Sequence, residues 1–245
     1  MPADSPTILA TSGGYVPGRR TRVELGPLVR LAVELSGVDG RTPRLGYLGT
    51  ANGDQAHAIA ERSEAARVAG FELNPLRLFT MPNVDDVEGY LLEQDVVWVD
   101  GGSVANLLAV WRVHGLDAIF RRVWEAGVVL AGVSAGSICW HTSGTTDSFG
   151  PELRAVQDGL GLLPYGNGVH YDSEDRRRPT VHRLVASGEL GLTYCTDDGV
   201  GLVYRGTDLM EAVTERRGKG AYVVARGADG EAVEERIEPR VLPGA

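Results

Sequence analysis

Short apolar runs alternate along the first half of the chain with longer amphipathic segments. The apolar runs predict β-strands at Thr7–Thr11, Arg44–Leu48, Asp95–Val99 and Val128–Val133. The amphipathic segments predict helices over about Thr21–Leu35, Gln55–Ala69, Val104–Val113 and Leu116–Ala126. Alternation of this kind favours an α/β fold, in which helices cover both faces of a mostly parallel sheet.

Glycine is abundant, and its positions are more informative than its number. The chain has 33 glycines in 245 residues, well above the average usage of about 7 %. Several of them lie at or around the ends of predicted strands: Gly13-Gly14, Gly49, Gly101-Gly102 and Gly132/Gly136. Parallel sheets bind ligands beyond the carboxyl ends of their strands, and glycine allows the backbone to approach a ligand closely. The pattern therefore indicates an enzyme with its site at this edge of the sheet.

Charge and composition exclude several classes of protein. The formal net charge is −9, which argues against a nucleic-acid partner because such proteins usually carry a basic face. The glycines have no three-residue period and 43 % of the residues are hydrophobic, which excludes collagen and disorder. No apolar run approaches the ~20 residues that span a bilayer. The first residues, Met1 to Thr11, lack the features of a signal peptide, so we expect a cytoplasmic protein with no membrane partner.

The pattern changes near residue 192 to short alternating strands separated by turns. These strands are expected at Leu192–Cys195, Val200–Tyr204, Leu209–Val213, Ala221–Ala225 and Ala232–Ile237. Turns of the Asp-Gly type between them are typical of β-hairpins. We therefore expect residues 192–238 to form antiparallel strands that extend the sheet edge, within a single domain comprising residues 1–245.

The sequence Gly132-Val133-Ser134-Ala135-Gly136 directly follows the apolar run at 128–131. A G-x-S-x-G pattern after a strand is typical of a nucleophile elbow, in which a strained turn exposes the serine oxygen. The alternative interpretation is an ordinary glycine-rich turn. We expect the helix after Ser134 to continue through Ser137–Trp140, with N-terminal amides and a dipole that favour an oxyanion.

A second glycine-rich turn, Asp100–Ser103, also follows a predicted strand and opens a helix. Ser103 is a candidate N-cap of that helix. One glycine amide of this turn and the amide of Ala135 would supply the two donors that acyl transfer requires. The alternative interpretation is a plain capped turn.

A nucleophilic serine needs a general base, and we favour His170 among the five histidines. His170 lies in the glycine-rich segment 166–172, which could approach the serine. His141 is expected on the same helix as Ser134, about 10 Å along its axis and out of reach. The remaining histidines are expected on or at the ends of solvated helices: His57, His114 and His182.

Several carboxylates are candidates for the group that orients this base: Asp147, Asp172, Glu174, Asp175, Asp197 and Asp198. We favour Asp198 because it follows a predicted strand and precedes Gly199. Asp172 is only two residues from His170, so we expect it to point elsewhere or to cap the loop. The resulting chain order of Ser, His and Asp differs from that of the α/β-hydrolases.

Neither the cysteines nor the histidines indicate a metal site. Cys139 and Cys195 form no CxxC pattern, and we expect them to be small buried side chains. The histidines show no HxxxH or HExxH spacing. We therefore expect no metal and no cofactor.

Taken in chain order, these motifs resemble peptidase family S51, which includes peptidase E and cyanophycinase. The resemblance covers about Ile8 to Val224 and rests on the Gly101-Gly102 turn, the elbow, the His170-Tyr171 loop and the Asp198-Gly199 turn. It implies a three-layer α/β sandwich of the class I glutamine amidotransferase type, a small-peptide substrate and a homodimer.

Carried over by position, the resemblance implies a role for five residues: Ser134 as nucleophile, His170 as base, Asp198 as acid, and the amides of Gly102 and Ala135 as the oxyanion hole. Two positions depart from the family pattern. Peptidase E has a glutamate where Asp198 stands, and the family's Gly-Gly-Asn-Thr run is here Gly-Gly-Ser-Val at 101–104. Specificity for Asp-X dipeptides therefore stays open.

Three further residues are candidates for substrate binding: Ser103, Arg177 and Arg178. Arginine suits recognition of a substrate carboxylate, although a solvated basic patch is the alternative. The expected function is hydrolysis of small peptides by an exopeptidase-like serine hydrolase through an acyl-enzyme. Two alternatives remain: a cyanophycinase-like hydrolase of β-linked Asp-Arg material, and a binding or regulatory protein on an inactive hydrolase scaffold.

Overall fold

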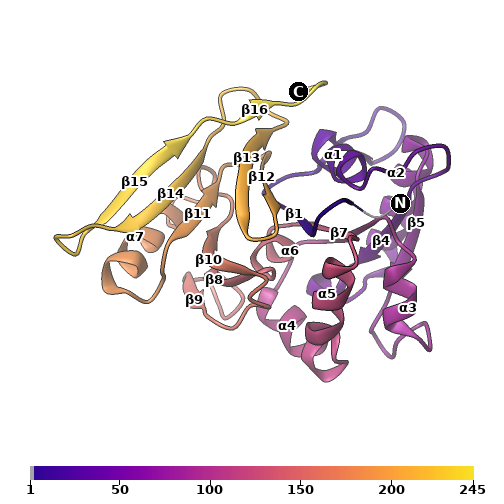
Figure 1. Cartoon of the computed structure of the whole chain (residues 1–245), viewed down its shortest axis with the longest axis horizontal. Coiled ribbons are helices and arrows are strands. Elements are labelled where there is room, and N and C mark those ends of the chain that lie inside the picture. Colours follow the sequence, from indigo (N-terminus) through magenta and orange to yellow (C-terminus); the bar gives the residue numbers. More distant parts are fainter. Residues whose placement is uncertain (1–2) are drawn as a thin grey trace.

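Two large sheets of different size build the protein (Figure 1), together with a separate two-stranded hairpin. The computed structural model describes residues 3–245, so Met1 and Pro2, at the start of the segment considered for a signal peptide, lie outside the described residues. The larger sheet has eight strands in the order β16 (Arg240–Val241), β13 (Asp208–Thr214), β12 (Val200–Arg205), β1 (Thr7–Thr11), β7 (Val129–Val133), β6 (Val96–Val99), β4 (Arg44–Leu48) and β5 (Glu72–Leu76).

Five adjacent strands of this sheet run parallel to one another: β1, β7, β6, β4 and β5. All four strands predicted in the first half of the chain are confirmed, β1 and β4 with the predicted bounds. β5 was not predicted, because its sequence Glu-Leu-Asn-Pro-Leu contains a proline that only an edge strand tolerates. The carboxyl ends of β1, β7 and β6 lie side by side, which is where an α/β sheet offers a site.

Helices cover both faces of the larger sheet (Figure 1), which confirms the predicted α/β fold class. Helices α1 (Pro27–Leu35) and α2 (Ala56–Ala69) pack on one face, against Leu9, Trp98 and Val129. On the other face lie α3 (Val87–Leu92), α4 (Val104–Val113) and α5 (Leu116–Glu125), which pack against Ile8, Val97 and Leu130. Neighbouring strand residues thus point to opposite faces, as the pleat requires.

The helix predicted from Thr21 begins only at Pro27. Residues before it form the hairpin of β2 (Tyr15–Pro17) and β3 (Val23–Leu25). Proline at the first helical position explains the start, because it has no amide to satisfy there. A short 3₁₀ turn, η1 (Thr50–Asn52), follows β4. Within residues 3–245 no helix has the length and apolar character needed to cross a membrane.

The smaller sheet has six strands in the order β15 (Ala232–Ile237), β14 (Ala221–Arg226), β11 (Thr193–Thr196), β10 (Leu163–Gly168), β8 (His141–Thr146) and β9 (Arg154–Val156). Helix α7 (Arg177–Ser187) packs on it through Val181, Leu184 and Val185, which contact Cys195 and Val224. Cys139 and Cys195 are buried free thiols, as predicted.

The strands predicted after residue 192 all form, but they divide between the two sheets. β12 and β13 extend the larger sheet by antiparallel pairing next to β1, as predicted. In contrast, β11, β14 and β15 belong to the smaller sheet, and β11 pairs in parallel with β10. The prediction of a helix through Trp140 is also wrong, because the smaller sheet takes up this segment too. Helix α6 (Ala135–Ile138) ends after one turn, and the chain continues into β8 of the smaller sheet.

The two glycines of the G-x-S-x-G segment lie against the backbone of β6. A Cβ added to Gly136 would lie 2.2 Å from the carbonyl oxygen of Val99, and one added to Gly132 would lie 2.6 Å from the same oxygen. Contacts this short require the backbone itself to move. The close approach of β6, β7 and α6 therefore depends on these glycines.

We predict that Gly136→Ala destabilises the fold by about 1–3 kcal/mol, because overpacking a rigid backbone contact costs this much. The change in the free energy of unfolding can be measured by urea denaturation. Gly191→Ala is the matched control, since an added Cβ there meets nothing within 4 Å and should change stability by less than about 0.5 kcal/mol. Equal stabilities of the two variants would contradict the prediction.

Candidate active site

Ser134 occupies the turn between β7 and α6 in a conformation that non-glycine residues rarely adopt. Its φ is 58° and its ψ is −113°. The Ser134 amide donates a hydrogen bond to the carbonyl of Thr11 (3.0 Å), and its carbonyl accepts from the amides of Ser137 and Ile138 (2.8 and 3.0 Å). This is the strained geometry of a nucleophile elbow.

The Gly101-Gly102 turn runs beside this serine. A Cβ on Gly101 would lie 3.3 Å from the Cβ of Ser134 and 3.8 Å from its Oγ. Gly102 has a φ of 140°, and a Cβ there would lie 2.3 Å from the carbonyl oxygen of Ala51, so only glycine fits. Within residues 3–245 the amides of Gly102 and Ala135 form no hydrogen bond, which leaves both donors unused. Because α6 is one turn long, its dipole adds little, and these amides are the main local donors.

His170 and Asp198 form a direct pair. The His170 Nδ1 and the Asp198 Oδ1 are 2.6 Å apart, and the two side chains are 25 % and 28 % exposed. His170 also has a positive φ of 53°. No hydrogen bond joins Ser134 Oγ to His170 within the described chain. Catalytic hydrogen bonds of this type are often long before a substrate binds.

Two residues at the end of β1 tie the three candidates together. Thr11 accepts the amide of Ser134, as described above, and Ser12 Oγ accepts the amide of His170 (3.1 Å). The Ser12 carbonyl accepts the amide of Gly199, the residue after Asp198, at 2.9 Å. Ser12 is 3 % exposed. Ser12 was not among the predicted site residues, although its place between the first predicted strand and Gly13-Gly14 was the available signal.

Within the described residues, none of the other five candidate carboxylates hydrogen-bonds the His170 imidazole. Asp172 Oδ1 accepts the amide of Asp198 (2.8 Å) and its Oδ2 pairs with Lys219, which agrees with the loop-capping role expected of it. Asp197 accepts the amide of Gly220 (2.8 Å), and burial raises the pKa of this carboxyl. The remaining three line a cavity of about 280 Å³ that His170 does not line: Asp147, Glu174 and Asp175.

The candidate substrate-binding residues are all engaged within the chain. Ser103 caps α4 by accepting the amide of Asn106 (3.2 Å), as predicted. Arg177 is 3 % exposed and its two terminal nitrogens bond to Thr145 and Glu174. These contacts make Arg177 part of the packing between α7 and β8. A role for Ser103 or Arg177 in binding substrate stays a prediction.

Arg178 has a different environment, since its side chain is 41 % exposed. Its guanidinium lies 4.5 Å from the ring centres of both Tyr171 and Tyr222, and it pairs with Glu234 on β15. Glu234 also accepts from the Tyr171 hydroxyl (2.7 Å) and contacts His182 at 2.9 Å. This cluster fastens β15 and α7 to the residue that follows His170.

His141 lies on β8 and not on the helix of Ser134, which corrects the sequence prediction. It is fully buried, its Nδ1 lies 2.9 Å from the carbonyl of Ser137, and its Nε2 has no partner in residues 3–245. Burial lowers the pKa of His141 to about 4. His57 is exposed on α2, His114 ends α4 and His182 lies on α7, in agreement with the helices expected for them.

We predict that His141 weakens the fold in acid. Its pKa is about 4 in the folded chain and about 6.5 when unfolded, so between these values the unfolded chain binds more protons and stability falls as pH decreases. The full loss is on the order of 3 kcal/mol. His141→Phe should flatten the dependence of the unfolding free energy on pH between about 6.5 and 4. His57→Gln, at an exposed histidine, should leave the slope unchanged; an unaltered slope in His141→Phe would overturn the assignment.

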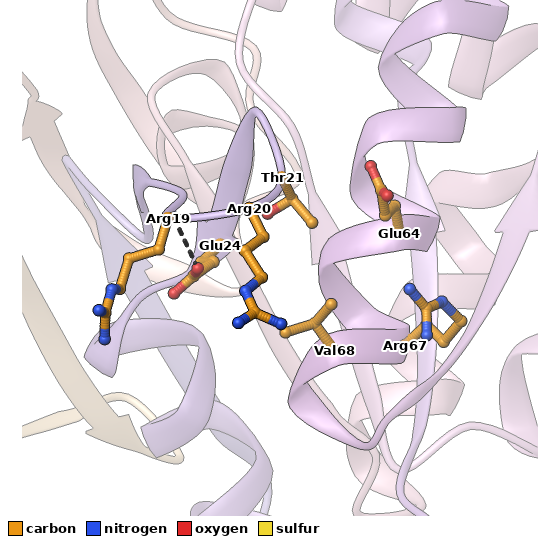
Figure 2. A pocket seen from close by; sticks show the side chains of 7 residues that line it. All are labelled: Arg19, Arg20, Thr21, Glu24, Glu64, Arg67 and Val68. Atoms are coloured by element: carbon orange, nitrogen blue, oxygen red, sulfur yellow. Dashed lines mark hydrogen bonds between the residues drawn. The ribbon is translucent and has the colours of Figure 1, made fainter.

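A cavity of about 630 Å³ lies between the β2–β3 hairpin and α2 (Figure 2). Its lining is mostly charged, with Arg19, Arg20 and Glu24 on the hairpin side and Glu64 and Arg67 on α2. None of the candidate catalytic residues lines it. Across residues 3–245 no group of three or more His, Cys, Asp or Glu side chains has an arrangement that could hold a metal ion.

The fold and site define a class of protein: an α/β protein whose larger sheet is covered by helices on both faces and carries a serine on a strained strand-to-helix turn. Residues 8–212 match the model of peptidase family S51, and 182 residues are 40 % identical to the uncharacterized peptidase YgaJ of Bacillus subtilis (strain 168), over 74 % of this chain and 78 % of that protein. The chain therefore belongs to peptidase family S51, and it is a peptidase.

Two solved structures share the fold at low sequence identity. A peptidase from an acI-B1 Actinobacterium is 17 % identical with a TM-score of 0.66, over 96 % of this chain and 95 % of that chain. A peptidase E-like protein from Listeria monocytogenes EGD-e is 16 % identical with a TM-score of 0.60, over 86 % of this chain and 98 % of that chain. The similarity at this level concerns the fold alone.

Proposed function

We propose that this peptidase uses Ser134, His170 and Asp198 as a catalytic triad to hydrolyse small peptides through an acyl-enzyme. The observation that carries the proposal is the convergence on Thr11 and Ser12, at the end of β1, of the segments that carry a strained serine and a His–Asp pair 2.6 Å apart. A structural turn has no need of such a conformation at a serine, and backbone strain of this kind concentrates at functional sites. We also propose that the enzyme acts in the cytoplasm, without nucleic-acid or membrane partners, as a homodimer.

The proposed reaction begins when Ser134 Oγ attacks the carbonyl carbon of the scissile bond. His170 accepts the serine proton through Nε2, while its Nδ1–H donates to Asp198, which stabilises the imidazolium that forms. The negative charge on the carbonyl oxygen is stabilised by the amides of Gly102 and Ala135. His170 then gives its proton to the leaving amine, and a water molecule that it activates hydrolyses the acyl-enzyme.

Two features bear on which peptide is cut. The Asp198 side chain is shorter than the glutamate of peptidase E, yet it contacts His170; Asp172 accepts the amide of Asp198, and the Ser12 carbonyl accepts that of the next residue, Gly199. At the rim of the site, Ser103 has its hydroxyl occupied in capping α4. We therefore propose a small-peptide substrate without assigning Asp-X specificity. A cyanophycinase-like activity on β-linked Asp-Arg material is the alternative within the family.

We predict that a fluorophosphonate probe labels the wild-type protein and that Ser134→Ala abolishes the labelling. His170→Ala should also abolish labelling, since the serine loses its base. Asp198→Ala should slow it by about 10³- to 10⁴-fold, because the imidazole loses its orientation. Mass spectrometry of the labelled peptide measures the site and the rate.

Ser63→Ala on α2 is the matched control and should be labelled like the wild type. A wild-type protein that stays unlabelled under conditions that label a known serine hydrolase would contradict the proposed nucleophile. That result would favour a binding or regulatory protein on an inactive scaffold.

We further predict that the enzyme releases free amine from a panel of dipeptides varied at the N-terminal residue, and that Ser134→Ala releases none. The rates across the panel define the preferred residue. Release of β-Asp-Arg from β-linked Asp-Arg material, with no turnover of dipeptides, would favour the cyanophycinase-like alternative. If no dipeptide of the panel releases amine, the enzyme is not a dipeptidase, and the fold assignment is unaffected.

A further inference from the structure

A second carboxylate and an ammonium lie directly behind the His170–Asp198 pair. Asp172 Oδ1 accepts the backbone amide of Asp198 at 2.8 Å, and Asp172 Oδ2 pairs with the Nζ of Lys219. The Asp198 carboxylate in turn accepts from His170 at 2.6 Å. A chain of contacts therefore runs from Lys219 through Asp172 to the backbone amide of Asp198, whose side chain bonds His170.

The backbone on both sides of this chain is fixed. Gly220, which follows Lys219, donates its amide to the Asp197 carboxylate (2.8 Å) and accepts the Asp197 amide through its carbonyl (3.1 Å). The amide of Tyr171, which precedes Asp172, donates to the carbonyl of Thr196 (3.0 Å). These contacts hold the backbone segment that carries Lys219 beside the segment that carries Asp197 and Asp198.

Asp172 thereby links the Lys219 ammonium to the segment that carries Asp198, because each of its two carboxylate oxygens bonds one of them. Asp172 forms an ion pair with that ammonium. Burial raises the pKa of Asp172, but the hydrogen bonds from Lys219 and from the amide of Asp198 outweigh this, so its pKa is lowered overall. The same bond to Asp172 raises the pKa of Lys219, with a smaller contribution from Asp198. The ion pair is therefore formed between Lys219 and Asp172, and both oxygens of Asp172 are used.

We propose that Asp172 is a positioning residue of the catalytic site, which holds the Asp198 backbone and keeps Lys219 away from the Asp198 carboxylate, so that this carboxylate is left for His170. Lys219 in turn cancels the charge that Asp172 adds beside the pair. The inference rests on the proposed triad, because it assigns to Asp172 and Lys219 the task of keeping Asp198 bonded to the base.

Five charged residues lie on the segments that carry or contact the His170–Asp198 pair: Asp172, Asp197, Asp198, Lys219 and Arg216, whose methylene groups lie against Gly199. Of these, Asp198 alone bonds the imidazole within the described chain. Changes at Asp172 and Lys219 alter the charge behind Asp198 in opposite directions. This gives the proposal a test that a purely structural role would fail.

Asp172→Asn leaves the Lys219 ammonium without its carboxylate. We expect kcat to fall by about 10- to 100-fold with KM changed less than about threefold, because the base loses its partner and not its substrate. The midpoint of the acidic limb of kcat/KM should move to lower pH, since an uncompensated positive charge disfavours the imidazolium. Lys219→Met should move it to higher pH, since the Asp172 carboxylate is then uncompensated.

The double variant Asp172→Asn/Lys219→Met removes both charges and should return the midpoint close to that of the wild type. Glu211→Gln is the matched control, because Glu211 forms an ion pair with Arg240 (2.7 Å) on β13 and β16 and should change neither kcat nor the midpoint. If Asp172→Asn folds poorly, Lys219→Met alone still decides the direction of the shift.

The same shifts can be measured without turnover, by NMR titration of the His170 ring in each variant. Opposite shifts in the two single variants support the proposal whether or not the enzyme is active. Unchanged midpoints, or shifts of the same sign in both, overturn it. Failure of fluorophosphonate labelling in the wild type would instead overturn the triad, so the two outcomes are distinguishable.

Discussion

Three backbone amides, from three separate segments of the chain, converge on two consecutive residues at the carboxyl end of β1. The Thr11 carbonyl accepts a hydrogen bond from the amide of Ser134. The Ser12 hydroxyl accepts one from the amide of His170, and the Ser12 carbonyl accepts one from the amide of Gly199. Both residues are buried, so losing any of these contacts would leave a polar group unsatisfied, at a cost of about 1–3 kcal/mol. The relative placement of the proposed nucleophile, base and acid therefore depends on this short segment.

The position of β1 explains why it can serve in this way. It pairs with β7 on one side and with β12 on the other, so the strand that ends just before Ser134 and the strand that begins after Gly199 are both its neighbours. His170 comes from the end of β10 in the smaller sheet, and Ser12 also contacts Thr196 Oγ1 at 2.7 Å, at the end of β11. The Ser12 side chain is thus the polar contact through which the smaller sheet meets the end of β1.

Much of the fold and part of the site could be predicted because their signals are local. The G-x-S-x-G segment, the Gly101-Gly102 turn and the Ser103 cap each depend on a few adjacent residues. The smaller sheet could not be predicted, because β8 reads His-Thr-Ser-Gly-Thr-Thr and β10 contains two glycines, and neither shows an apolar alternation. The partner of Arg177 could not be predicted from the sequence either. A guanidinium can bind a substrate carboxylate or the carboxylate of Glu174, and only the tertiary fold decides between them.

Ser134 and His170 both have positive φ values, so surrounding contacts must hold the proposed nucleophile and base in strained conformations. Each such conformation costs on the order of 1–3 kcal/mol and persists only where the surroundings enforce it. At Ser134 the enforcement comes from Thr11 and from the first turn of α6, and at His170 it comes from Ser12 and from the amide of Glu174 (3.2 Å). Because Thr11 and Ser12 are adjacent, a shift of β1 would relax both strained residues together. The nucleophile and the base are therefore expected to lose their alignment as a unit, which makes the end of β1 as important to the proposed reaction as the side chains that carry it out.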